Sequence, residues 1–443
     1  MGIFHAYDIR GVYPKELNEK VAYLIGRALV VYLKQHEYVV GMDARMSSPA
    51  LTRALVKGII EQGGDVVLIG RCTTPEYNWV CAHYLYKAGV MVTASHNPKE
   101  YNGFKVNAAH ATPIGYDNGL NKVEKLVAKG KFPKSPRFGK TRIHDHTTDY
   151  VHYLKKLIPH PIHHLSVVVD ESNGTEGRVA RHLFHELGIT LHSLNYTPLG
   201  TFPHHSPNPL DPKSQRQIEH EVMRRKADLG ILFDADADRV LFIDENGHPV
   251  SPNHIMAFLA YHYAHPGEVV VYDTTTSQVV PDQIKIKEAK GIQSPVGRSH
   301  VLHHMKKYKA LLGGESSGHY FFREVYGTDS GILAALKVME ILSRTNKPLS
   351  YLLERFKKYA KSGDINIPLH TESEKQRVMK KIERTYKKGA KLNKKDGLTF
   401  QYKDWWFNIR ASNTEPLLRL NIEANHWAEM EHKKEEILRV IHS

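Results

Sequence analysis

The stretch ADLGILFDADADR, residues 227–239, joins an uninterrupted apolar run to a polar loop, and the chain repeats this arrangement. The other examples are YVVGMDARMSS (38–48), AGVMVTASHNP (88–98), SVVVDESNGTEG (166–177), EVVVYDTTTSQ (268–278) and KALLGGESSGH (309–319). Amphipathic stretches of helical period lie between these runs. Apolar strands that alternate with helices predict mainly parallel sheets covered on both faces, whose ligands bind past the carboxyl ends of the strands.

The order of these runs predicts three consecutive α/β domains with mixed, mainly parallel sheets. After about Gly363 the pattern changes to a short strand, a Lys-rich helix, an aromatic strand at 404–410, another strand and a final helix, which predicts a small α+β domain. The expected domains are 1–145, 146–250, 251–362 and 363–443. Each α/β domain supplies one of these polar loops, so we expect the domains to be arranged around a central cleft where the loops meet.

Composition narrows the function without deciding it. The 443 residues are 41% hydrophobic and 24% charged, as in ordinary globular proteins. A formal charge of +14 suits either nucleic acid or a small phosphorylated molecule. The densest basic stretch, 375–395, lacks the aromatic platform of a single-strand binder, so we interpret it as a solvated helix face and expect no nucleic-acid partner.

Three features of the sequence bear on the cellular compartment of the protein. It has no apolar run of the roughly 18 residues that span a bilayer, and it begins with charges and a turn instead of a signal-peptide core. Two cysteines, Cys72 and Cys81, are too few for a disulfide framework. We therefore expect a cytoplasmic protein without a membrane partner.

Asp234, Asp236 and Asp238 form the first candidate site. Carboxylates at every second position of an extended loop point the same way and can surround one hard divalent cation. An EF-hand loop is a weak alternative, since it needs glycine where Arg239 stands. A phosphoaspartate nucleophile and a plain solvated turn remain open for this loop alone.

Ser95 is the second candidate, in the loop VTASHNP. A serine that carries phosphoryl groups needs nearby cations, which a metal and Lys105 would supply. The alternative is a serine that caps a following helix or turn.

Two further loops contain groups suited to sugars and phosphates. Glu315 and Ser317 offer a carboxylate and a hydroxyl, and His319 could transfer protons or be merely structural. The second loop is ASNTEP, residues 411–416, and Arg410 and Arg419 near it offer guanidinium groups. Hydroxyl and amide groups follow Arg410, at Ser412, Asn413 and Thr414.

These four loops, in this order, resemble those of the α-D-phosphohexomutases, and the resemblance runs from AYDIRG (6–11) to NIRASNTEPLLRLNIEA (408–424). It implies that Ser95 is the phosphoserine, with Lys105, Arg10 and Tyr7 beside it. It implies that Mg²⁺ is held by Ser95, Asp234, Asp236 and Asp238, with Arg239 following. It assigns sugar recognition to Glu315 and Ser317, proton transfer to His319, and phosphate binding to Arg410, Ser412, Asn413 and Thr414.

The resemblance implies interconversion of hexose 1-phosphate and hexose 6-phosphate through a hexose 1,6-bisphosphate. Asn413 and the metal loop favour mannose over glucosamine, with glucose as a second candidate. A non-catalytic sugar-phosphate binder is the alternative function, and the sequence leaves open whether the chain is a monomer or a dimer.

Thr275 stands where many members have Lys or Arg. Arg298 stands where many have His, and His300 lies two residues on; Arg298 is expected to bind phosphate.

Overall fold

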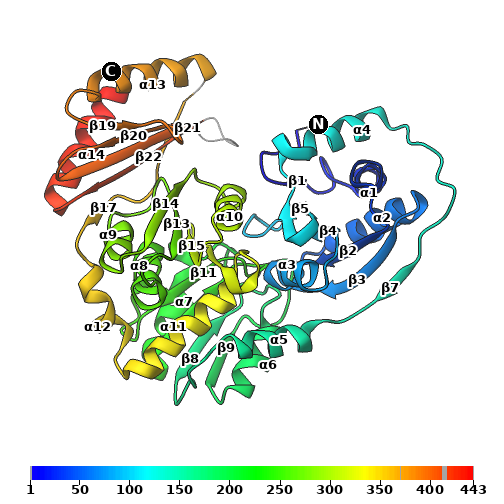
Figure 1. The fold of residues 1–443 in the computed structure, drawn as a ribbon, viewed down its shortest axis with the longest axis horizontal. Coiled ribbons are helices and arrows are strands. Elements are labelled where there is room, and N and C mark those ends of the chain that lie inside the picture. The colour runs from blue at the N-terminus through cyan, green and yellow to red at the C-terminus, as the bar shows by residue number, and fades with distance from the viewer. Residues whose placement is uncertain (1, 370, 412–416, 443) are drawn as a thin grey trace. The chain divides into compact units, whose positions relative to one another are not determined.

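The computed structural model describes residues 2–369, 371–411 and 417–442 (Figure 1). Its contacts divide the chain into two compact units. The first contains residues 1–252 and 317–352, and the second contains residues 253–316 and 353–443. Each unit is described by itself.

A mixed sheet organises the beginning of the first unit. Its strands lie in the order β1 (Ile9–Val12), β5 (Tyr101–Ala108), β4 (Ala88–Val92), β2 (Glu37–Met42), β3 (Asp65–Arg71) and β7 (Thr141–Ile143). The strands β4, β2, β3 and β7 are parallel, whereas β5 runs antiparallel to both β4 and β1. The short β6 (Thr112–Pro113) pairs with β5.

Helices cover both faces of this sheet because alternate residues of its strands point to opposite sides. Val90 and Val92 pack into one core with α1 (Glu19–Leu33), α2 (Ser48–Glu61) and α4 (Asn121–Lys129). Gly89, between Ala88 and Val90, faces α3 (Thr74–His83). A Cβ there would lie 2.7 Å from the Tyr77 hydroxyl and 2.8 Å from the Cys81 sulfur, so only glycine lets α3 approach this closely.

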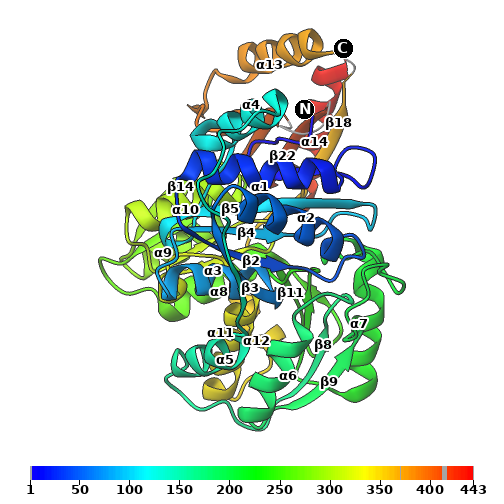
Figure 2. The same cartoon turned by 90° about the vertical axis from the view of Figure 1, so that its right-hand side faces the viewer.

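The second sheet of this unit has the order β12 (Pro249–Val250), β11 (Val240–Ile243), β10 (Leu229–Phe233), β8 (Ser166–Asp170) and β9 (Thr190–Leu194). The strands β10, β8 and β9 are parallel, and β11 returns antiparallel to β10. Figure 2 shows α6 (Gly177–Glu186) and α7 (Pro212–Arg225) on either side of β8 and β9. The unit also contains α5 (Thr147–Lys156), β16 (Tyr320–Phe322), α11 (Gly331–Thr345) and α12 (Leu349–Leu353).

The second unit begins with α8 (Pro252–Tyr263) and a parallel arrangement of β14 (Lys290–Ser294), β13 (Val269–Asp273) and β15 (Leu312–Gly314). Two helices, α9 (Val279–Ile286) and α10 (Arg298–Lys307), connect these strands. The predicted alternation of strands and helices is therefore present here too.

An antiparallel sheet follows, in the order β17 (Ala360–Lys361), β22 (Leu417–Ala424), β21 (Trp405–Ala411), β20 (Leu398–Gln401) and β19 (Lys391–Asn393). The strand β18 (Ile365–Pro368) also pairs with β22. The helices α13 (Glu372–Tyr386) and α14 (Trp427–His442) share its apolar core. The tail is thus α+β as predicted, but β19 and β20 were not expected because their short runs carry little periodicity.

No helix among the described residues is long and apolar enough to cross a membrane. Both cysteines are buried and unbridged.

Candidate active site

The three aspartates lie in the tight connection between β10 and β11. All three are at most 1% exposed, and a carboxylate oxygen from each lies within 4.8 Å of the others. Five buried apolar residues of β10 fix the start of this loop, and Ala237 takes a positive φ of 58° to complete it. The predicted clustering of Asp234, Asp236 and Asp238 is confirmed.

Electrostatics make this cluster costly without a cation. Burial, and after it the neighbouring Asp238 and Asp236, raises the pKa of Asp234 well above its ordinary value. Within the described residues, Oδ1 of Asp236 has no hydrogen-bond partner although it is buried. Three converging carboxylates with an unsatisfied oxygen fit Mg²⁺, which prefers oxygen ligands.

Lys105 is a cation that reaches the cluster. It lies on β5, where it pairs in register with Met91 of β4. Its Nζ lies 2.6 Å from Oδ2 of Asp236 and 2.5 Å from Oδ2 of Asp238. Two hydroxyls also donate to Oδ2 of Asp236, from Thr74 at 2.6 Å and from Thr93 at 3.2 Å.

Ser95 lies beside the same cluster. It follows β4, is 3% exposed, and donates from Oγ to Oδ2 of Asp234 at 2.7 Å. Its φ is 48°, a left-handed conformation that costs a non-glycine residue about 1 kcal/mol or more. Of the two alternatives, a helix cap does not apply, since the loop leads into β5 and no helix starts there, whereas Ser95 does lie in a turn.

The conformation of the Ser95 loop is held by Arg45, which sequence reasoning did not single out. Arg45 is 1% exposed and donates to four backbone carbonyls, those of Ser95, Asn97, Pro98 and Tyr101, at 2.6–2.9 Å. Its Nε lies 3.1 Å from Asp43. The only sequence signal was an Asp-x-Arg directly after a buried strand.

Arg10 reaches the same loop from β1. It donates to Oδ1 of Asn97 at 2.6 Å and lies 2.5 Å from Asp8. Tyr7 precedes this strand and is half-buried.

His319 lies next to Asp238 and Arg239. Nδ1 of His319 is 2.8 Å from the Ser317 hydroxyl, and Nε2 is 3.3 Å from Nε of Arg239 and 3.4 Å from Oδ1 of Asp238. Because Arg239 can only donate, Nε2 accepts in the neutral imidazole and Nδ1 carries the proton. An imidazole with this tautomer can take a proton on Nε2, and Asp238 stabilises the resulting charge.

His96 is a second imidazole at Ser95 that the sequence argument gave no role. Its Nδ1 lies 3.3 Å from Oγ of Ser95. Burial, followed by the cations of Arg239 and Arg10, lowers the pKa of His96 well below its usual value, so its ring is neutral.

The other predicted groups belong to the second unit. Glu315 follows β15, is 5% exposed, and accepts from the backbone N–H of Gly297 at 2.9 Å. Arg298 begins α10 directly after that glycine. Lys361 was missed by sequence reasoning: it donates to the carbonyl of Thr275, 86 positions earlier, and burial lowers its pKa.

Arg410 and Arg419 lie directly opposite each other on β21 and β22. Like charges opposite each other across two strands are destabilising, so this pair favours a bound anion. Nε of Arg410 is buried without a hydrogen-bond partner in the part of the chain that the structure describes. Ser412, Asn413 and Thr414 lie outside the described residues.

The fold and the site together define a mixed α/β protein with a buried carboxylate cluster suited to a divalent cation. Family models described as "Phosphoglucomutase/phosphomannomutase" match in four parts: α/β/α domain I at 1–134, domain II at 148–247, domain III at 251–359 and the C-terminal domain at 365–440. The chain therefore belongs to the phosphoglucomutase/phosphomannomutase family of isomerases, the α-D-phosphohexomutases.

Individual relatives agree with this assignment. A phosphomannomutase of Escherichia coli K12 is 35% identical over 95% of this chain and 94% of its own. The phosphohexose mutases of Xanthomonas campestris are also 35% identical, with the same coverage. A crystal structure of a family protein from Burkholderia thailandensis superposes with a TM-score of 0.91, at 29% identity and with 99% and 97% of the two chains covered.

Proposed function

We propose that this chain interconverts hexose 1-phosphate and hexose 6-phosphate, with mannose as the preferred sugar, through a phosphoserine at Ser95 and a hexose 1,6-bisphosphate. The observation that carries the proposal is the 2.7 Å hydrogen bond from Ser95 to Asp234, inside the three-aspartate cluster that Lys105 also reaches.

The reaction balances as two phosphoryl transfers. A free hydroxyl of the sugar phosphate attacks the phosphorus on Ser95, the bond from phosphorus to Oγ breaks, and the bisphosphate forms. The hydroxyl proton passes to Nε2 of His319, which Ser317 and Asp238 hold in place. The bisphosphate then reorients and returns its other phosphate to Oγ of Ser95, while the proton returns to the sugar.

The surrounding cations stabilise charge during each transfer. Mg²⁺ held by Asp234, Asp236 and Asp238 would supply a further positive charge at the phosphoryl group. Lys105 lies on the same carboxylates, and Arg239 adjoins His319. In the second unit Glu315 suits sugar hydroxyls, whereas Arg298, Arg410 and Arg419 suit the phosphate that is not transferred.

The metal loop and Asn413 argue against glucosamine, and the name phosphomannomutase of the E. coli relative supports mannose as the preferred sugar. Glucose is the second candidate, because the two sugars differ in the orientation of one hydroxyl.

The test is conversion of mannose 1-phosphate and glucose 1-phosphate to their 6-phosphates, with Mg²⁺ and a trace of the bisphosphate. Ser95→Ala should remove both turnover and the incorporation of one phosphate into the protein, whereas Ser135→Ala, in the connection before β7, should retain both. Turnover that persists in Ser95→Ala would exclude the phosphoserine. No turnover by the intact chain, together with binding of the sugar phosphates, would support a non-catalytic binder instead.

A further inference from the structure

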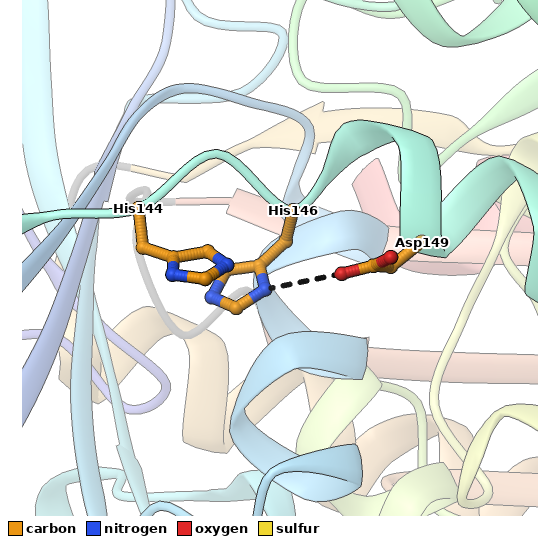
Figure 3. A group of neighbouring side chains, drawn as sticks. All are labelled: His144, His146 and Asp149. Carbon is orange, nitrogen blue, oxygen red and sulfur yellow. Dashed lines mark ion pairs between the residues drawn. The ribbon is translucent and has the colours of Figure 1, made fainter.

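Figure 3 shows His144, His146 and Asp149 gathered where the connection after β7 enters α5. One candidate ligand atom from each lies within 4.8 Å of the others. These residues are separate from the three-aspartate loop, and the proposed reaction uses none of them.

His146 is the residue that points to a ligand. It is 3% exposed, and both its ring nitrogens are buried without a hydrogen-bond partner in residues 2–369, 371–411 and 417–442. A buried imidazole normally satisfies its nitrogens, because an unpaired buried polar group costs about 1–3 kcal/mol. Its Nδ1 faces Oδ2 of Asp149 at 4.0 Å, too far for a hydrogen bond (Figure 3). An atom that binds both would account for this spacing.

The other two proposed ligands, His144 and Asp149, lie at the protein surface. His144 and Asp149 are exposed, and the ring of His144 stacks on His146 with 4.0 Å between centroids. Ligands of a tetrahedral zinc ion lie about 3.3 Å apart, given metal–nitrogen distances near 2.0 Å. Nδ1 of His146 and Oδ2 of Asp149 lie 4.0 Å apart, close to this spacing, and the exposed His144 ring would have to turn off its neighbour to complete the site.

A neighbouring side chain already orients the carboxylate. The hydroxyl of Tyr84 donates to Oδ2 of Asp149 at 2.9 Å, and its ring lies 4.5 Å from that of His146. Metal-binding carboxylates commonly accept such an outer hydrogen bond, which fixes their direction. Asp149 also lies in the first turn of α5, where its charge offsets the positive end of the helix that would repel a cation.

We propose that His144, His146 and Asp149 bind a divalent transition metal of the zinc type. Two imidazoles and one carboxylate favour such an ion over Mg²⁺, which prefers oxygen ligands throughout. The fourth position faces solvent and takes a water molecule. The bound metal fastens the end of β7 to the first turn of α5. Both histidines lie in 135–147, between the residues that the two adjoining family models match, and Asp149 lies at the start of the second match.

The experiment titrates zinc into the intact, chelator-treated protein, in competition with a chromogenic chelator. Excess Mg²⁺ is present throughout to occupy the three-aspartate cluster. The wild type should bind one zinc ion per chain more than His144→Ala and Asp149→Asn. Tyr84→Phe should retain the site with affinity lowered about 10-fold. The matched control is His160→Ala, which removes an exposed histidine outside the cluster and should bind as the wild type does.

Thermal unfolding supplies a second readout. Zinc should raise the Tm of the wild type and of His160→Ala but leave that of His144→Ala unchanged. Since His144 is exposed, its removal should not affect folding, and the zinc-free melting curve verifies this. Equal zinc stoichiometry and equal affinity in the wild type, His144→Ala and Asp149→Asn would overturn the proposal.

Discussion

The hydroxyl of Ser95 donates a 2.7 Å hydrogen bond to Oδ2 of Asp234, although the two residues are 139 positions apart. The loops after β4 and β10 bring them together, each at the carboxyl end of a buried strand. This pairing places an oxygen nucleophile beside three buried carboxylates. Buried negative charges are strongly destabilising unless nearby cations compensate them. The behaviour of the cations around the cluster is therefore the most direct test of the site.

Lys105→Met removes the cation that lies 2.6 and 2.5 Å from Asp236 and Asp238. Breaking a buried ion pair leaves an uncompensated charge, so the free energy of unfolding should fall by about 3 kcal/mol in Mg²⁺-free buffer. Added Mg²⁺ should restore part of this loss, and should thus stabilise the variant more than the wild type. Urea denaturation with and without Mg²⁺ measures both effects.

The control for this prediction is Lys57→Met, which removes an exposed lysine 3.9 Å from Glu61. It should change stability by less than about 0.5 kcal/mol, with or without Mg²⁺. If Lys105→Met behaved like this control, Lys105 would not be a compensating charge of the cluster.

Arg45→Lys tests the residue that positions the Ser95 loop. A lysine ammonium cannot replace a planar guanidinium that donates to four carbonyls and to Asp43. Unsatisfied buried acceptors should lower the free energy of unfolding by about 2 kcal/mol. Incorporation of phosphate into Ser95 should also slow, because the left-handed conformation of Ser95 depends on this loop.

Arg137→Lys provides the comparison, since Arg137 forms an exposed pair with Asp65. This variant should incorporate phosphate at the wild-type rate. A normal rate in Arg45→Lys as well would show that the Ser95 loop holds its conformation without the guanidinium.

The candidate site was predictable where chemistry and spacing coincide within one loop. Asp234, Asp236 and Asp238 were singled out by their period of two after an apolar strand, and Ser95 by its polar loop, although each loop taken alone left alternatives open. The role of Arg45 was not predictable, because all four carbonyls that it contacts belong to the backbone. Every residue has such a carbonyl, so the sequence does not indicate which ones an arginine will contact. Lys361 was missed for a related reason: its acceptor, the carbonyl of Thr275, lies 86 positions away.

The fold followed the same division. Long apolar runs such as those of β2, β8 and β13 predicted the parallel strands, and the order of elements predicted the α+β tail. The antiparallel direction of β5 was not foreseen, because a strand's direction depends on its partners and not on its own period. That direction places Lys105 opposite Met91, and so brings it to the aspartates.

His319→Gln tests the proposed proton acceptor. Glutamine keeps a polar side chain beside Arg239 but cannot take a proton, so kcat should fall about 100-fold or more while KM changes little. Steady-state kinetics with mannose 1-phosphate measure both constants. The exposed His152 offers the matched control, and His152→Gln should leave kcat unchanged. A loss confined to KM would instead assign His319 to substrate binding.

Glu171 gives the protein a pH-dependent stability that has the opposite sign to that of most carboxylates. It is 0% exposed, and burial followed by the charge of Asp170 raises its pKa to about 8. In the unfolded chain it titrates near 4.5. Between these values the folded state holds a proton that the unfolded state has lost, so stability falls as the pH rises.

Glu171→Gln removes this titration and keeps the shape of the side chain. Relative to the variant, the wild type should lose at least about 1.4 kcal/mol between pH 5 and pH 8, the equivalent of one pKa unit. Urea denaturation at both pH values measures the difference, and comparison of the two proteins cancels the histidines they share. Asp65→Asn is the control, because the hydrogen bond from Arg137 lowers the pKa of that carboxylate, whose contribution is therefore constant above about pH 5. If the wild type and Glu171→Gln lost stability equally between pH 5 and 8, Glu171 would be ionised in the folded protein, and a cation would have to lie beside it.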